Sequence, residues 1–174
     1  MSLTLIVGPA NSGRSTLARW LTKEATLAGA RNVLLYSEEY TKDHVIRLLE
    51  NEDVSLSQVF VSSEGMSEAG AYHSPYIFDL AVPPADGEWK HAWLLAQSAD
   101  VYVLLQCPKE GVLRSTRTLM EVADNVWRLE RIGNVISQYE MKARGHIPAG
   151  LLTRQWVLED RHLTLQTPTK QVTP

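Results

Sequence analysis

Several features that would define a functional class are scarce in this chain. Of its 174 residues one is a cysteine, Cys107, so no disulfide framework can form within the chain. The five histidines show no metal-ligand spacing, and with a single cysteine they predict no transition-metal site. The net charge of −3 is compatible with a nucleic-acid partner without requiring one, because a local basic loop can bind phosphates on an acidic protein.

Long apolar runs are also scarce. Residues 3–7 are apolar, but five residues are too few for a signal peptide or a membrane span, so we expect no membrane association. A single cysteine suits a reducing compartment, and we expect a cytoplasmic protein. The composition, 44% apolar and 21% charged, is ordinary for one globular domain. We place that domain at residues 1–166, with a flexible tail at 167–174.

The order of sequence patterns predicts an α/β fold. The first part alternates short apolar runs with helical periodicity, and the last part alternates in the manner of strands joined by tight turns at Gly133-Asn134 and Glu159-Asp160. We expect a mainly parallel central sheet flanked by helices, followed by an antiparallel β meander. The predicted strands are 3–7, 33–36, 59–61, 76–78, 101–106, 126–130, 135–141 and two around Trp156 and Leu163; the predicted helices are 15–28, one capped by Thr41, and 87–98.

Residues 8–16, Gly-Pro-Ala-Asn-Ser-Gly-Arg-Ser-Thr, have the spacing of a Walker A phosphate loop between a strand and a helix. Glycines let the backbone wrap round an anion, the helix N-terminus attracts it, and the Ser15 hydroxyl is placed to bind Mg²⁺. The pattern predicts a nucleoside triphosphate site, with ATP and Mg²⁺ as the ligands. The predicted binding residues are Gly8, Asn11, Ser12, Gly13, Arg14, Ser15 and Thr16.

Arg14 stands where a Walker A loop has lysine. Lysine is a compact point charge that reaches the β- and γ-phosphates, whereas arginine is a bulkier planar fork. The substitution bears on rate more than on binding, and it predicts slow hydrolysis.

Two acidic positions follow apolar strands. Glu38 and Glu39 come after the second strand, where a carboxylate could orient or deprotonate an attacking water. A solvated acidic loop is the alternative. Asp79 ends the run Tyr76-Ile77-Phe78, which is the Walker B pattern for a carboxylate held near Mg²⁺.

Taken together, these segments resemble the RecA-like core of the DnaB-type replicative helicases and the related RadA (Sms) branch-migration ATPases, in order across roughly residues 3–165. The resemblance implies that Glu39 is the catalytic glutamate and that Gln106, at the end of the fifth strand, senses the γ-phosphate. Residues 121–126, Glu-Val-Ala-Asp-Asn-Val, are similar to a Glu-x-x-Ala-Asp segment of that family.

Residues 141–145, Met-Lys-Ala-Arg-Gly, are similar to the family's Lys-x-Arg segment. The resemblance implies that Lys142 and Arg144 reach a neighbouring subunit's triphosphate, with Arg144 as the finger that stabilises transition-state charge. Solvated charges at a strand end are the alternative. Residues acting in trans require a homo-oligomer, either a closed ring of six or an open filament. The chain departs from the family at Arg14, in a short segment after Asp79, and in having no organising or zinc-binding domain beside the core.

Basic side chains follow the fifth strand. The resemblance implies that DNA contacts the loops after the fourth and fifth strands, and the second of these, 108–117, contains Lys109, Arg114 and Arg117. Such a loop can contact phosphates without reading sequence, although exposed loops often contain this many charges.

These features favour an ATP-binding, ATP-hydrolysing oligomer that acts on single-stranded DNA in replication or recombination. A regulatory adaptor with a weakened ATP site, controlling a partner helicase or recombinase, is the second hypothesis, and Arg14 favours it. A small-molecule kinase of the P-loop class is a third, which the antiparallel C-terminal part disfavours.

Overall fold

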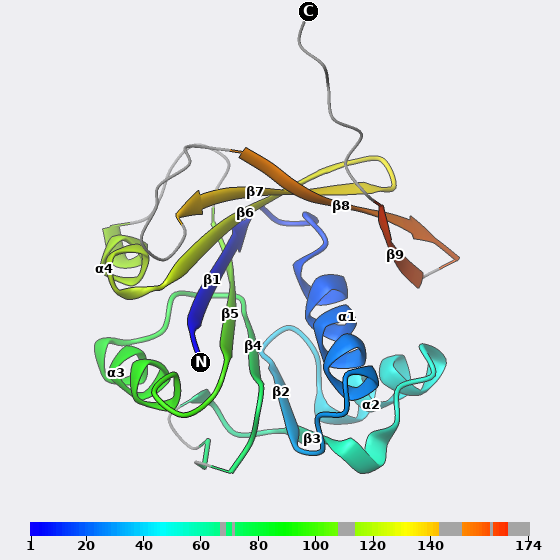
Figure 1. Ribbon diagram of the computed structural model, residues 1–174, viewed down its shortest axis with the longest axis horizontal. Coiled ribbons are helices and arrows are strands. Elements are labelled where there is room, and N and C mark those ends of the chain that lie inside the picture. Colours follow the sequence, from blue (N-terminus) through cyan, green and yellow to red (C-terminus); the bar gives the residue numbers. More distant parts are fainter. Residues whose placement is uncertain (67–68, 71, 108–113, 143–150, 161, 167–174) are drawn as a thin grey trace, which may run out of the picture.

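The computed structural model describes residues 1–66, 69–70, 72–107, 114–142, 151–160 and 162–166. In this part of the chain the strands form one sheet of nine, in the order β3-β2-β4-β5-β1-β6-β7-β8-β9 (Figure 1). The strands are β1 Leu3–Gly8, β2 Val33–Ser37, β3 Val59–Ser62, β4 Tyr76–Leu80, β5 Val101–Gln106, β6 Asn125–Ile132, β7 Val135–Lys142, β8 Leu151–Glu159 and β9 His162–Gln166. The predicted mixed sheet is confirmed.

The first six strands are parallel, and β6 to β9 are antiparallel to one another. The central strands β1, β4 and β5 are continuous apolar runs because helices cover both of their faces. The Gly133 turn, with φ of +61°, reverses the chain between β6 and β7, and Asp160, with φ of +46°, does so between β8 and β9. Both turns were predicted from the sequence.

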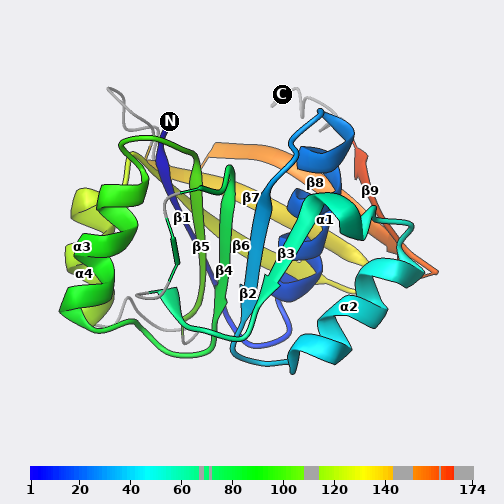
Figure 2. The same cartoon turned by 90° about the horizontal axis from the view of Figure 1, so that it is seen from below.

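The helices form a layer on each face of the sheet (Figure 2). On one side lie α1 (Arg14–Leu27) and α2 (Lys42–Asn51), which pack on a core that includes Ile6, Leu35 and Ile77. On the other lie α3 (Asp86–Leu95) and α4 (Arg114–Val122), over a core that includes Leu5 and Phe78. A short 3₁₀ turn, η1 (Leu56–Gln58), precedes β3.

Three details differ from the sequence-based expectation. Residues 114–122 form α4, where a loop was expected up to Arg117, because Leu119 and Ala123 are buried against the sheet at helical spacing. Asp79 lies within β4 and does not end it, since Leu80 completes the strand. Trp89 is buried as expected, but Trp93 is 48% exposed and lies outside the core.

The parallel register brings the carboxyl ends of four strands to one edge. Gly8 of β1 is paired with Gln106 of β5, and Ser37 of β2 is paired with Asp79 of β4. β6 runs parallel to β1 and pairs Arg128 with Val7, so its last residues continue past the end of β1. The segment between β1 and α1 therefore lies beside the β6–β7 hairpin. No described helix is long and apolar enough to cross a membrane.

Candidate nucleotide site

The loop between β1 and α1 has the backbone of a phosphate-binding turn. Asn11 and Gly13 have positive φ values of +61° and +88°, and Gly13 is the N-cap of α1. Among the described residues no side chain caps this helix, so its first amide groups are available to an anion. A Cβ on Gly8 would lie 2.4 Å from Ser12 Oγ, which explains why glycine is needed at that position.

The meander supports this loop from the side. A Cβ on Gly13 would lie 2.2 Å from Cδ1 of Ile136 in β7, and one on Gly8 would lie 3.3 Å from Cβ of Leu129 in β6. Ile136 and Leu129 are both fully buried. The loop therefore packs directly on two strands that come more than a hundred residues later in the chain.

Arg14 is the centre of a polar cluster beneath the loop. Its side chain is 4% exposed, and its guanidinium donates to Leu80 O at 2.8 Å, to Glu39 Oε1 at 2.9 Å and to Gln106 Oε1 at 3.2 Å. The same group lies 3.8 Å from Asp79 Oδ1. A planar fork with five donors suits this arrangement, which a lysine ammonium could not reproduce in full.

Glu39 joins this cluster to α1. Its Oε1 accepts from Arg14, and its Oε2 accepts from the Ser15 hydroxyl at 3.0 Å. The neighbouring Glu38 is engaged elsewhere, since its Oε2 accepts from the backbone N–H groups of Ala81 and Val82. The two adjacent glutamates therefore differ, and Glu39 is the one directed into the site.

Asp79 is a buried carboxyl beside the cluster. Burial raises its pKa above the usual 3.8 and the nearby charge of Glu39 adds to the rise, whereas Arg14 and the hydroxyls of Ser15 and Ser37 oppose it. Its Oδ2 accepts from Ser37 Oγ at 3.3 Å, and its buried Oδ1 has no hydrogen-bond partner among the described residues. The Ser12 hydroxyl is also buried without a described partner. Two unsatisfied oxygens at one strand edge fit a site that receives a further polar ligand.

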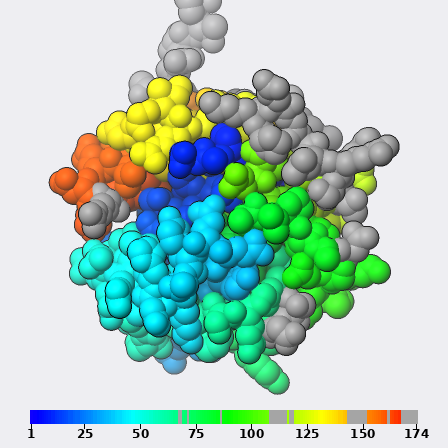
Figure 3. All heavy atoms as spheres, turned by 180° about the vertical axis from the view of Figure 1, so that it is seen from behind, coloured from blue at the N-terminus to red at the C-terminus, as the bar shows by residue number. Residues whose placement is uncertain are grey.

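These groups line an open pocket of about 220 Å³ at the carboxyl edge of the sheet. Residues 10–16 form its base, Glu39, Tyr40 and Gln106 form one side, and Arg131 of β6 lies on the other. In Figure 3 the blue atoms of the N-terminal part of the chain lie between the cyan segment near α2 and the yellow β6–β7 hairpin. The pocket combines backbone donors, hydroxyls, carboxylates and two arginines.

The same arrangement of elements occurs in known proteins. Over 93% of this chain and 89% of the other, the structure matches the RadB recombinase at a TM-score of 0.68 and 14% identity. It matches the flagellar accessory protein FlaH of Methanocaldococcus jannaschii at 0.69 and 14%, over 95% of this chain and 89% of the other. An ATPase domain of the DnaB type matches at 0.68 and 13%, over 93% and 84%. No protein-family model and no curated protein sequence matches the chain.

The chain has the RecA-like P-loop ATPase fold. This RecA-like domain gathers Gly8, Gly13, Ser15, Glu39 and Gln106 into one pocket, with Asp79 beside it, as the sequence led us to expect for their positions. Their roles toward a ligand remain predictions.

The other predicted site residues lie elsewhere or outside the described residues. Lys142 Nζ donates to the carbonyls of Met120, Glu121 and Ala123 at the end of α4, at 3.1, 2.9 and 2.6 Å. Arg114 and Arg117 belong to α4, although their side chains are not described. Lys109 and Arg144 fall outside the described residues.

Sequence reasoning missed Arg131. The signal was present, because residues 126–132 alternate as a strand and place Arg131 on the same face as the buried Leu129. What the sequence alone could not supply is the parallel pairing of β6 with β1, which brings that face to the phosphate loop.

Proposed function

We propose that this protein binds ATP with Mg²⁺ in the pocket at residues 8–16 and acts as an oligomeric RecA-like ATPase on single-stranded DNA. The observation that carries the proposal is the loop with positive φ at Asn11 and Gly13 at the end of a central parallel strand, with Glu39 and Asp79 beside it. Backbone donors of this kind bind phosphates, and carboxylates at this edge suit a divalent cation.

The residues present fit the metal as well as the phosphates. Ser15 Oγ and Asp79 Oδ1 would hold Mg²⁺, which neutralises charge on the phosphate oxygens when bound. Glu39 would accept a proton from an attacking water, and Gln106, at the end of β5, would contact the terminal phosphate. The buried Ser12 hydroxyl would donate to a phosphate oxygen.

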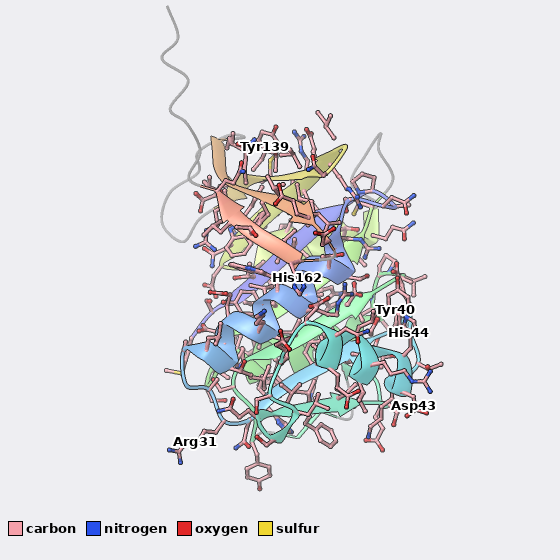
Figure 4. All side chains as sticks on the ribbon, turned by 90° about the vertical axis from the view of Figure 1, so that its right-hand side faces the viewer. Arg31, Tyr40, Asp43, His44, Tyr139 and His162 are labelled. Atoms are coloured by element: carbon pink, nitrogen blue, oxygen red, sulfur yellow. The ribbon has the colours of Figure 1, made fainter. Side chains whose placement is uncertain are left out.

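The pocket continues in a direction that suits a nucleoside. Thr16 lines the phosphate pocket and also two hollows of about 310 and 350 Å³ beside α1, which share Glu52 and His162. Figure 4 shows His162 of β9 over α1. A base and ribose attached to a triphosphate at residues 10–16 would have room along this helix.

Nucleotide binding is tested by titrating ATP, with and without Mg²⁺, into the full chain. We expect saturable binding that weakens when Mg²⁺ is removed. Turnover is then compared for wild type, Glu39→Gln and the matched control Glu38→Gln. Loss of about 100-fold or more in Glu39→Gln alone supports the role of Glu39 as base. Equal turnover in all three contradicts that role.

A second function, an adaptor that uses ATP as an assembly switch and regulates a partner helicase or recombinase, is favoured by the contacts of Arg14. The guanidinium already bonds both Glu39 and Gln106, the two side chains expected to handle the water and the terminal phosphate. A carboxylate neutralised in this way is a weaker base.

Arg14→Lys separates the two functions, with Arg19→Lys as the control on the same helix, because Arg19 pairs with Glu52 outside the phosphate pocket. Negligible wild-type turnover that rises in Arg14→Lys supports the switch. Substantial wild-type turnover that falls in Arg14→Lys supports the motor. The control is expected to leave turnover unchanged.

Assembly and DNA binding are tested together by measuring particle size with and without ATP and a single-stranded oligonucleotide. The proposed oligomer predicts a larger species with ATP, completed by Arg144 and Lys142 of a neighbouring subunit. Replacing Lys109, Arg114 and Arg117 by alanine should weaken DNA binding and reduce its salt dependence. The same change at the exposed Arg31, Arg47 and Lys90 is the control. Equal effects of the two sets would argue against a specific DNA-binding segment.

A further inference from the structure

The β6–β7 hairpin forms one wall of the phosphate pocket, and a single cation of that hairpin lies there. Arg131 lines the pocket together with residues 10–16. It belongs to the part of β6 that continues beyond the end of β1, since the last pair between the two strands joins Val7 and Arg128. A parallel strand that extends further than its neighbour places its last side chains beside the loop that follows the neighbour.

The position of Arg131 is fixed by packing. Arg131 is paired with Ile136 across the hairpin, and it is two residues from Leu129 on the same strand. Alternation along a strand puts these three side chains on one face. Ile136 and Leu129 are the side chains packed against Gly13 and Gly8 of the phosphate loop. The hairpin therefore holds Arg131 at the mouth of that loop.

The two arginines of the pocket differ in what they already bind. Arg14 is buried and donates to Leu80 O, Glu39 and Gln106. Arg131 is exposed, and its Nε donates to Gly133 O at 2.8 Å. Within the described part of the chain no carboxylate lies within 4.0 Å of Arg131, and its two terminal nitrogens have no hydrogen-bond acceptor. The bond to Gly133 fixes the guanidinium without using these two nitrogens.

A triphosphate needs positive charge beyond backbone donors and a metal ion. The cation at the Walker A lysine position is committed to the protein's own acceptors, so another must supply that charge. We propose that Arg131 binds the phosphates of the nucleotide in cis, with the two terminal nitrogens of its guanidinium as donors to phosphate oxygens. This assignment rests on the proposed nucleotide binding, and it adds a residue that no Walker motif contains.

The test compares Arg131→Ala and Arg131→Lys with Arg128→Ala. Arg128 lies on the same strand, is similarly exposed, and bonds Glu130 outside the pocket. The probes are ATP, adenosine and inorganic tripolyphosphate, the last of which has phosphates and no base. We expect Arg131→Ala to weaken ATP and tripolyphosphate by about 10- to 100-fold and adenosine hardly at all. Arg131→Lys should retain part of the affinity, and Arg128→Ala should retain all of it.

The possible failures are distinguishable. If wild type binds ATP and Arg131→Ala binds it equally well, the assignment fails and the proposed function stands. If Arg131→Ala weakens ATP and adenosine alike and leaves tripolyphosphate unchanged, Arg131 contacts the base and the phosphate assignment is wrong. If wild type binds neither ATP nor tripolyphosphate, both proposals fail together. Unfolding midpoints of all variants, expected to match wild type because both side chains are exposed, exclude misfolding as the cause.

Discussion

The parallel and antiparallel parts of the sheet contribute to the pocket in different ways. In the parallel part the strand ends carry the polar groups themselves: the loop after Gly8, Glu39 shortly after β2, Asp79 in β4 and Gln106 at the end of β5. In the antiparallel part the contribution is mostly apolar support, from Leu129 and Ile136 under the loop. The comparison teaches that strand ends determine the chemistry of this site, whereas the meander determines its shape.

The same contrast appears in the two arginines. Arg14, which follows a parallel strand, is buried among the acceptors at the strand ends. Arg131, from the meander, is exposed at the opposite wall. A buried cation with three partners stabilises the empty site, and an exposed one is free to meet a ligand. Each of the three predictions below tests one side of this comparison.

The largest effect is expected where the two parts touch. Gly13→Ala introduces a side chain at φ of +88° and only 2.2 Å from Ile136 Cδ1. The strained backbone and the clash together should lower the free energy of unfolding by about 2 to 4 kcal/mol and abolish nucleotide binding. Urea unfolding of the purified chain measures the first effect, and ATP titration measures the second.

A double-mutant cycle separates the clash from the backbone strain. Ile136→Val alone should cost about 1 kcal/mol, since it removes one buried methyl group. Combined with Gly13→Ala it removes the closest contact, so the pair should be about 1 kcal/mol more stable than the sum of the single changes predicts. Strictly additive effects would mean that the meander does not support the loop.

A smaller effect is expected in the parallel part, from the raised pKa of Asp79. A carboxyl with a higher pKa in the folded than in the unfolded state favours folding at low pH. This contribution is complete below the unfolded value, about 3.8, and is lost as pH rises through the folded value. Asp79→Asn cannot ionise, so it should gain stability relative to wild type as pH rises from about 3.8. Each tenfold difference between the folded and unfolded acid dissociation constants corresponds to about 1.4 kcal/mol.

Urea unfolding of wild type and Asp79→Asn between pH 4 and 7 measures this difference, and the exposed Asp43→Asn on α2 reports the effect of removing a surface carboxylate. A wild type that gains stability relative to Asp79→Asn with rising pH would show that the pKa of Asp79 is lowered. In that case the charge of Arg14 would outweigh burial, and the empty pocket would already be electrostatically satisfied.

The sequence was sufficient for the parallel part because its signals are local. A continuous apolar run such as Leu3–Val7 predicts a buried strand, and the residues that follow it must lie at the carboxyl edge. The positions of Ser15, Asp79 and Gln106 follow from this rule, and the loop spacing predicted the glycines. For these residues local pattern and final position agree because the helices and strands alternate regularly.

The sequence was insufficient where position depends on pairing between distant segments. Nothing near Ile136 indicates that it packs on Gly13, and nothing near Arg131 indicates a phosphate loop. The commitment of Arg14 to Glu39 and Gln106 likewise depends on three strand ends meeting. The loop expected around Arg114 and Arg117 was wrong because burial of Leu119 and Ala123 favours a helix that the charged residues concealed.

The smallest effect is expected at Lys142, at the far end of the meander from the phosphate loop. Its ammonium bonds three carbonyls at the end of α4, a position where a cation also interacts favourably with the helix dipole. Lys142→Met should therefore lower the free energy of unfolding by about 1 to 2 kcal/mol in dilute protein without ATP, and Lys142→Arg by less. A role in trans predicts instead unchanged stability and lower turnover in the oligomer. If both quantities change, Lys142 holds α4 in place in one subunit and thereby positions the segment that would reach the next.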